Sequence, residues 1–289
     1  MTDATTATGP VATSLPTSLP TSLPEDVDGA VDPCQPNQAS QPGLNILVSG
    51  VGGQGTVLTV KLLAECALAG GAFVRSAETI GMAQRGGSVL GHVRIAQGLQ
   101  VGAFSPGSAG SAGSPGFPGS AGSAGSAGSA GSPGSAGSPG SIMMSPLVPL
   151  GGADLLIGFE PAETLRAFPY CRSGASVISA STPLAPPAVA LQKLVYDGKR
   201  QLEALEQAAA SGHISRIVIV DNDSVMSQLG FFRALNVVLL GAMLRVLTEC
   251  AHPYSTLLNL ETMQSTLRTF MKPQFLEINL KALEIGYQQ

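Results

Sequence analysis

Residues 45–69 read NILVSGVGGQGTVLTVKLLAECALA. The apolar run 45–49 is typical of a short buried strand, and it leads directly into a glycine-rich turn at 50–55. Over residues 56–69 the apolar side chains recur on one face of a helix, and residues 72–75 follow with the composition of a second strand. Strand, glycine turn, helix and strand together form the βαβ unit of a doubly wound sheet.

The glycine turn has the spacing of a phosphate-binding loop. Gly50 allows a tight turn, Gly52 lets a ligand or another backbone come close, and Gly55 lets the helix pack against the strand. The helix then presents unpaired N–H groups and the positive end of its dipole to an anion. Gly53 and Gln54 complete this candidate site. The residues alone leave two interpretations open, a phosphate-type ligand or close packing at a subunit contact.

A second motif, ETIGMAQRGGSV at residues 78–89, adds further candidate contacts. The planar guanidinium of Arg85 can bind a carboxylate or a phosphate through two parallel hydrogen bonds. Glycines at the next two positions let a backbone approach the group that Arg85 holds. The alternative is a turn in which Arg85 pairs with an acidic residue of this chain. The candidate contact residues of this motif are Glu78, Gln84, Arg85, Gly86 and Gly87.

The remainder of the pattern supports an α/β fold. Residues 88–95 are predicted to form a strand that pairs with residues 99–104. Further buried strands, each followed by a helical stretch, are predicted at 154–159, 175–179 and 216–221. Helical spacing continues from residue 231, with a final pair of helices at about 255–270 and 274–285. The sequence therefore predicts a single Rossmann-like, doubly wound domain with a mostly parallel sheet and C-terminal helices.

Two low-complexity segments accompany this domain, which spans residues 44–286. Residues 1–43 contain no Lys or Arg and repeat Thr-Ser-Leu-Pro, so we expect a disordered tail. Residues 105–141 contain no charge and carry glycine at every third position between 107 and 140. That is the period of collagen, but the proline content is low, so we expect a flexible loop within the domain.

Composition argues against several classes of protein. The chain has 15 Lys and Arg against 19 Asp and Glu with no concentrated basic face, so we do not expect it to bind nucleic acid. It lacks an apolar stretch of about 18 residues, so we expect no membrane span. Its four cysteines and three histidines lack the spacing of a zinc or iron–sulfur site. We therefore expect reduced thiols in a cytoplasmic protein that holds no metal.

In combination, the two glycine motifs resemble those of a known family. GVGGQG at 50–55, ETIGMAQRGGSV at 78–89 and HVRI at 92–95 are similar to the gamma domain of the 2-oxoacid:ferredoxin oxidoreductases. The likeness is strongest to the small (beta) subunit of the indolepyruvate:ferredoxin oxidoreductases. Further similar positions are residues 153–156, residues 160–166, Gly230, Asn236 and Gly241.

The resemblance implies an accessory subunit of a larger enzyme. Such enzymes oxidatively decarboxylate a 2-oxoacid, here an aryl pyruvate, with thiamine diphosphate, and they form an acyl-coenzyme A. Electrons pass through 4Fe–4S clusters to ferredoxin, in cytoplasmic, anaerobic metabolism. This chain lacks a magnesium–diphosphate motif and cluster ligands, so thiamine diphosphate, Mg²⁺ and the clusters are expected on a large catalytic partner. The isolated chain should be inactive, and contact of its glycine turn with coenzyme A is an open expectation.

Two other functions stay open at this level. A stand-alone NAD(P)-dependent oxidoreductase would hold a pyrophosphate at the glycine turn and a ribose hydroxyl at Glu78. A non-catalytic assembly scaffold would use the same glycines for protein contacts only. His92 lies on a predicted strand without a neighbouring carboxylate in the sequence, so we interpret it as a buried structural residue rather than a catalytic acid or base.

Overall fold

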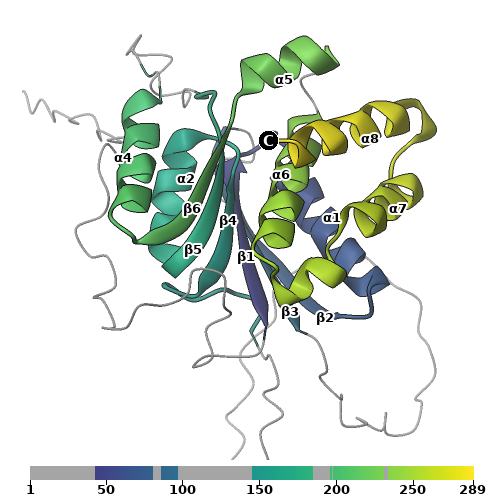
Figure 1. Cartoon of the computed structure of the whole chain (residues 1–289), viewed down its shortest axis with the longest axis horizontal. Coiled ribbons are helices and arrows are strands. Elements are labelled where there is room, and N and C mark those ends of the chain that lie inside the picture. The colour runs from purple at the N-terminus through teal and green to yellow at the C-terminus, as the bar shows by residue number, and fades with distance from the viewer. Residues whose placement is uncertain (1–42, 81–85, 97–144, 185–195, 197, 231–233) are drawn as a thin grey trace, which may run out of the picture. The chain divides into compact units, whose positions relative to one another are not determined.

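The computed structural model describes residues 43–80, 86–96, 145–184, 196, 198–230 and 234–289. These residues form an α/β domain around a sheet of order β2-β3-β1-β4-β5-β6 (Figure 1). The strands are β1 (Leu44–Val51), β2 (Phe73–Ile80), β3 (Ser88–Ala96), β4 (Ala153–Gly158), β5 (Cys171–Ala180) and β6 (Ile214–Val220). The predicted α/β fold with a mostly parallel sheet is confirmed. Tail residues 1–42 and the predicted loop 105–141 lie outside the described residues and stay predictions.

The helices follow the strands in the predicted alternation. The first helix has the bounds that its apolar spacing predicts. From residue 235 onward, all the regular elements are helices. The helices are α1 (Thr56–Ala69), α2 (Pro161–Ala167), α4 (Lys199–Ala210), α5 (Asn222–Leu229), α6 (Leu235–Glu249), α7 (Leu260–Phe270) and α8 (Pro273–Tyr287).

One strand lies where the sequence did not predict it. β1, β4, β5 and β6 are parallel, whereas β3 runs antiparallel between β1 and β2. Both edges of β3 are paired over residues 89–95, so the predicted pairing of 88–95 with 99–104 was wrong. The link from β2 to β3, residues 81–87, is shorter than the dozen or so residues that a parallel crossover needs. β3 therefore turns back beside β2 and separates it from β1.

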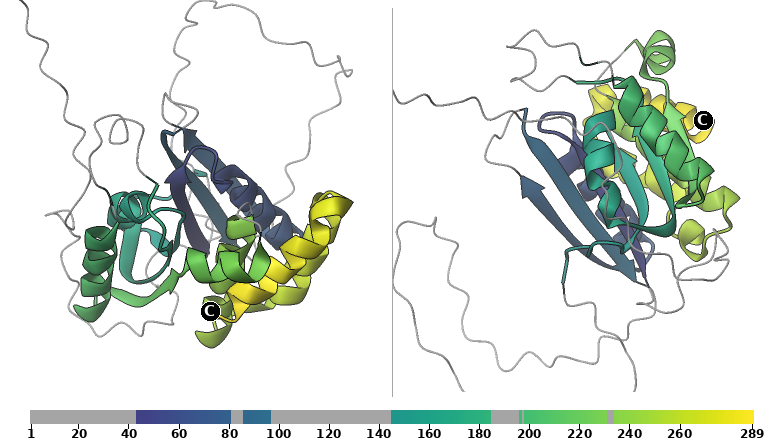
Figure 2. Two further views of the ribbon diagram at one scale, coloured as in Figure 1. Left: turned by 90° about the horizontal axis from the view of Figure 1, so that it is seen from above. Right: turned by 90° about the vertical axis from the view of Figure 1, so that its left-hand side faces the viewer.

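Both faces of the sheet are covered, because alternate strand residues point to opposite sides. Ile46 and Val48 of β1 belong to the core beneath α1, α6, α7 and α8, whereas Leu47 belongs to the core beneath α2 and α4. Figure 2 shows these two helical layers on either side of the strands. The near-continuous apolar composition of β1 follows from this double burial.

The two glycine motifs lie at the carboxyl ends of the parallel strands. Gly50, Val89 and Ile80 are in register across β1, β3 and β2 at these ends. The glycine turn that follows β1 and the glycines that precede β3 therefore lie on the same side of the sheet's strand ends. In open α/β sheets, ligands bind beyond the carboxyl ends of the strands.

α6 and α8 pack closely through a glycine on each helix. A Cβ atom at Gly286 would overlap the backbone carbonyl of Val238 in α6. A Cβ atom at Gly241 would overlap the carbonyl oxygen of Leu283 and lie 2.7 Å from the backbone nitrogen of Tyr287 in α8. The two helices therefore approach backbone to backbone, which only glycine at both positions allows.

Candidate functional site

The glycine turn leaves no room for a side chain at its first position. A Cβ atom at Gly50 would lie 2.8 Å from Cγ2 of Thr56 and 2.9 Å from both Oε1 of Gln54 and Cβ of Phe159. Gly55 adopts φ 95° at the start of α1, a left-handed conformation that favours glycine. The chain thus turns as tightly as the glycine spacing predicts.

The last glycine of the turn has a different neighbour from the predicted one. The sequence predicts that Gly55 lets α1 pack against its strand, but the side chain of Asn236 in α6 lies 3.5 Å from the position of a Gly55 Cβ atom. α6 reaches this point because it covers the same face of the sheet as α1. Gly53, in contrast, is exposed, and a Cβ atom there would meet nothing within 4 Å. Gly53 is therefore the part of the turn that is open to an outside contact.

Backbone hydrogen bonds join the two glycine motifs. The N–H of Gly52 donates to the carbonyl of Gly87 at 2.8 Å, and the N–H of Gly86 donates to the carbonyl of Gly52 at 3.4 Å. These bonds extend the β1–β3 ladder by one step. Gln84 and Arg85 lie outside the described residues, so their contact roles stay predictions.

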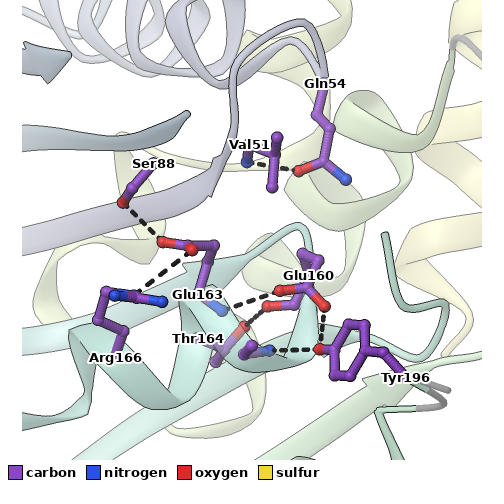
Figure 3. A network of polar contacts seen from close by, with 9 residues as sticks. Val51, Gln54, Ser88, Glu160, Glu163, Thr164, Arg166 and Tyr196 are labelled. Atoms are coloured by element: carbon purple, nitrogen blue, oxygen red, sulfur yellow. Dashed lines mark hydrogen bonds and ion pairs between the residues drawn. The ribbon is translucent and has the colours of Figure 1, made fainter. Parts of the chain in front are cut away.

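Gln54, a predicted contact residue, is used within the chain. Its Oε1 accepts a hydrogen bond from the N–H of Val51 at 2.7 Å (Figure 3). Its Nε2 donates to the carbonyl of Phe159 at 3.1 Å. The side chain therefore links the glycine turn to the end of β4. These two bonds give Gln54 a structural role in shaping the turn.

Glu78 lies apart from the glycine turn. It is an exposed residue of β2, opposite Gly91 of β3, which in turn is opposite Val48 of β1. A ribose-binding acid normally ends the strand adjacent to β1. Because β3 occupies that adjacent place, Glu78 does not hold this position, and the geometry does not favour the dinucleotide-binding alternative.

A buried acidic network beside the turn was missed by the sequence reasoning (Figure 3). Glu160 caps α2, where its Oε2 accepts a hydrogen bond from the N–H of Glu163 at 2.9 Å. Its Oε1 accepts a hydrogen bond from the hydroxyl of Tyr196, which also accepts one from the N–H of Ala162 at 3.2 Å. Burial raises the pKa of Glu160 above its ordinary value. Burial, together with the bond to Glu160, also raises the pKa of Tyr196.

The second carboxylate of this network holds the start of β3. The hydroxyl of Ser88 donates to Oε2 of Glu163 at 2.6 Å, and Nε of Arg166 lies 3.4 Å from Oε1 of Glu163. Ser88 follows the glycines of the second motif directly. α2 therefore holds the second glycine motif through the Glu163–Ser88 bond, and the residue that follows β4 holds the first through the Phe159–Gln54 bond.

We expect that in the Glu160→Gln variant the free energy of unfolding falls less as pH rises than it does in wild type. A carboxyl whose pKa is raised on folding stabilises the native state fully only below its unfolded pKa, and that stability is lost as pH rises through the folded pKa. The glutamine side chain of the variant keeps an oxygen for the N–H of Glu163 and does not ionise. Urea denaturation between pH 4 and pH 8 should show wild type losing stability relative to the variant as pH rises. If the free energies of unfolding of wild type and variant change with pH in parallel, the pKa of Glu160 is not raised.

Two clefts flank the glycine turn. One has a volume of about 640 Å³ and extends from the turn to the segments that follow β5 and β6. It is lined by Gly52, Gly53, Gln54, Gly55, Leu58, Thr182, Pro183, Leu184, Asn222, Leu235 and Asn236. The other, of about 590 Å³, lies between the turn, the first turns of α1 and the ends of β2 and β3. Both volumes are in the range of small-molecule sites.

His92 and two buried thiols, Cys66 and Cys171, have structural roles. His92 is buried, its Nδ1 accepts a hydrogen bond from the N–H of Val148 at 3.2 Å, and burial lowers its pKa. Burial raises the pKa of Cys66 to about 11 and that of Cys171 to about 12, and neither is in a disulfide. Both thiols are therefore weak nucleophiles. His92 is the buried structural residue that the sequence indicates.

The described parts of the chain contain neither a cluster of metal-ligating side chains nor a helix that could span a membrane. Among the described residues, no three His, Cys, Asp or Glu side chains lie together as a metal ion would require. None of the helices found there has the length and apolar character to cross a bilayer.

Comparison with known proteins identifies one matching family and several similar proteins. The family described as pyruvate ferredoxin/flavodoxin oxidoreductase matches residues 45–109 and 137–289. Indolepyruvate oxidoreductase subunit IorB of Archaeoglobus fulgidus is 30% identical over 246 residues, which cover 85% of this chain and 94% of that protein. The IorB subunit of Pyrococcus horikoshii is 26% identical, with 84% and 93% covered. Among solved structures, pyruvate oxidoreductase subunit PORC of Thermotoga maritima gives a TM-score of 0.49 at 16% identity, with 86% and 97% covered.

Proposed function

Because this chain belongs to the pyruvate ferredoxin/flavodoxin oxidoreductase family, we propose that it is the accessory small subunit of an indolepyruvate:ferredoxin oxidoreductase. The holoenzyme would oxidatively decarboxylate an aryl pyruvate to an aryl-acetyl-coenzyme A. The observation that carries this proposal is the similarity to IorB subunits over nearly their whole length. The gap in the family match, residues 110–136, falls within the predicted loop 105–141, which supports an insertion into an otherwise ordinary subunit.

The redox chemistry is assigned to a larger partner. The described residues offer no cluster of metal-ligating side chains, so they do not fit an iron–sulfur cluster or a magnesium–diphosphate site. When bound to the partner, thiamine diphosphate would stabilise the carbanion left by decarboxylation, and 4Fe–4S clusters would carry electrons to ferredoxin. The residues of this chain would shape and close the partner's site. We place the complex in the cytoplasm, consistent with the free thiols Cys66 and Cys171.

The glycine turn is proposed to face the coenzyme A site. α1 begins there without a side-chain cap, so its first N–H groups can bind an anion. Lys61 lines the cleft beside β2 and adds a cation to this side of the turn. Arg85 directly precedes the two glycines of the second motif that are hydrogen-bonded to Gly52. These features support contact with a phosphate group of coenzyme A.

The proposal is tested by purifying the chain under anaerobic conditions from cells that also express its large partner. We expect a complex that contains iron and thiamine diphosphate and that reduces ferredoxin with indolepyruvate and coenzyme A. The chain expressed alone should be colourless and inactive. An isolated chain that decarboxylates a 2-oxoacid unaided, or binds iron stoichiometrically, would overturn the assignment.

Within the assembled enzyme, Arg85→Ala is expected to raise the KM for coenzyme A roughly tenfold, because a charge-assisted hydrogen bond contributes about 1.5 kcal/mol or more. The kcat should change little, because this contact would bind substrate and transition state alike. Arg268→Ala, at an exposed position on α7, is the matched control. If Arg85→Ala weakens assembly and leaves the KM unchanged, the glycine motifs serve as a scaffold instead.

A further inference from the structure

Two consecutive residues after β4 hold two walls of one cleft. The cleft of about 640 Å³ has the glycine turn as one wall and the segment Thr182–Leu184 as another. The carbonyl of Phe159 accepts a hydrogen bond from Nε2 of Gln54 at 3.1 Å, and Gln54 belongs to the turn. The next residue, Glu160, is connected to the second wall.

Glu160 reaches the second wall through Tyr196 and through Leu184. Its Oε1 accepts a hydrogen bond from the hydroxyl of Tyr196, two residues before Gly198 (Figure 3). A Cβ atom at Gly198 would lie 3.1 Å from Cβ of Pro183, so the chain next to Tyr196 packs against this wall. Burial raises the pKa of Glu160, and the nearby backbone N–H of Leu184 partly opposes that rise. Leu184 therefore lies close to the same carboxylate.

The hydroxyl of Tyr196 ties the chain before α4 to the start of α2. It donates to Oε1 of Glu160 and accepts a hydrogen bond from the N–H of Ala162 at 3.2 Å. Capping of α2 does not depend on this hydroxyl, because Oε2 of Glu160 already accepts the N–H of Glu163. The hydroxyl therefore fixes the second wall relative to the end of β4.

The cleft lies where open α/β sheets bind their ligands. β1 and β4 are adjacent and parallel, yet the helix that follows β1 covers one face of the sheet and the helix that follows β4 covers the other. The carboxyl ends of these two strands therefore form a topological switch point, beside which ligands bind. Phe159 and Glu160 follow β4 directly, so both walls are held from this point.

We propose that Glu160, together with Tyr196, is a positioning residue for coenzyme A, which extends from the glycine turn into this cleft. The proposal rests on the proposed function, which brings a phosphate of coenzyme A to the turn. The uncharged pantetheine arm suits this cleft, because the described residues that line it carry no charged side chain. Neither Glu160 nor Tyr196 needs to touch the ligand. They hold the two walls in place before binding, so that binding does not have to order them.

Tyr196→Phe removes the hydroxyl and leaves the cap of α2 in place. In the assembled enzyme we expect the KM for coenzyme A to rise roughly fivefold or more, with kcat within about twofold of wild type, because a loosened wall weakens binding alone. Tyr287→Phe is the matched control, since it removes a hydroxyl that lies 3.4 Å from Oγ1 of Thr248, on the C-terminal helices. It should leave both constants unchanged.

Substitutions at Glu160 test the same link from its other end. Glu160→Leu removes both carboxylate oxygens and should raise the KM for coenzyme A at least as much as Tyr196→Phe does. Glu160→Gln keeps an oxygen for the N–H of Glu163 and an amide for the hydroxyl of Tyr196, so it should recover most of the lost affinity. If Glu160→Leu lowers only the stability of the chain and leaves the KM as in wild type, Glu160 has a purely structural role and the proposal is wrong.

A tryptophan at position 184 reports on the wall in the isolated chain, which has no tryptophan of its own. Leu184 is exposed, so Leu184→Trp places the reporter at the surface of the wall. Adding Tyr196→Phe should lower the fluorescence anisotropy of this reporter, whereas adding Tyr287→Phe should not. Equal anisotropy in the two double variants would show that the hydroxyl of Tyr196 does not hold the wall, and would overturn the proposal.

The two levels of the argument fail in different ways. A wild-type chain that forms no complex with the large subunit, or a complex that turns over without coenzyme A, refutes the proposed function. A wild-type complex that uses coenzyme A with a KM that Tyr196→Phe leaves unchanged refutes only the positioning role.

Discussion

Gly286→Ala is expected to lower the free energy of unfolding by roughly 2 kcal/mol, although alanine is the better helix former. At an exposed helix position this change would stabilise the protein by about 1 kcal/mol. In α8, however, the added Cβ atom overlaps the carbonyl oxygen of Val238 and lies 2.7 Å from its carbonyl carbon. A backbone carbonyl within a buried helix cannot rotate away, so α6 and α8 must separate. Overpacking of this kind costs about 3 kcal/mol, which exceeds the gain in helix propensity.

The measurement is urea and thermal unfolding of the isolated chain. A loss of roughly 2 kcal/mol corresponds to a decrease of about 4–8 °C in the thermal midpoint for a domain of this size. Glu284→Ala, at an exposed position on the same helix, is the control and should change stability by no more than about 0.5 kcal/mol. If Gly286→Ala is as stable as wild type, α6 and α8 do not pack backbone to backbone.

The strand, turn and helix at residues 44–69 could be predicted because their determinants are local. The apolar run, the glycines and the helical spacing act within a few residues of one another. The position of β3 could not be predicted in the same way, because β3 reads as a strand whichever neighbours it takes. Its place depends on the short link at 81–87, which forces a hairpin with β2 and leaves its other edge for β1.

In the candidate site, too, the parts with local determinants could be predicted and the parts that depend on tertiary packing could not. The two glycine motifs are visible in the sequence, and the structure brings their glycines together. Glu160 had a usable signal, because an acidic residue before Pro161, with Glu163 following, is typical of a helix start. Tyr196 had no such sequence signal, because its hydroxyl donates to Glu160, which lies 36 residues away in the chain. The burial of the Oδ1 atoms of Asn222 and Asn236 without a partner among the described residues depends equally on tertiary packing.

Gly50→Ala is expected to destabilise the chain by roughly 3 kcal/mol and to weaken assembly with the large subunit. The new Cβ atom would lie within 2.9 Å of the side chains of Thr56, Gln54 and Phe159. Crowding of this kind costs about 2 kcal/mol. Phe159 is fully buried, so Gln54 is the neighbour that can move, and its bond to the N–H of Val51 would be lost at a further cost of about 1 kcal/mol.

Gly53→Ala is the matched control for this substitution. A Cβ atom at Gly53 has open space around it, so the only cost is the strain of a positive φ, about 1–2 kcal/mol. Unfolding of both variants by urea measures the difference. Equal stability of the two variants would contradict the crowding at Gly50.

Gln54→Leu then separates crowding from hydrogen bonding. Leucine keeps most of the side-chain volume but leaves the N–H of Val51 and the carbonyl of Phe159 without their partner. If the turn is held in place mainly by Gln54, this variant should weaken assembly as much as Gly50→Ala does, with a smaller loss of stability. If the turn keeps its shape through the Gly52–Gly87 backbone bonds alone, Gln54→Leu should assemble normally. The comparison therefore identifies which contact gives the glycine turn its shape.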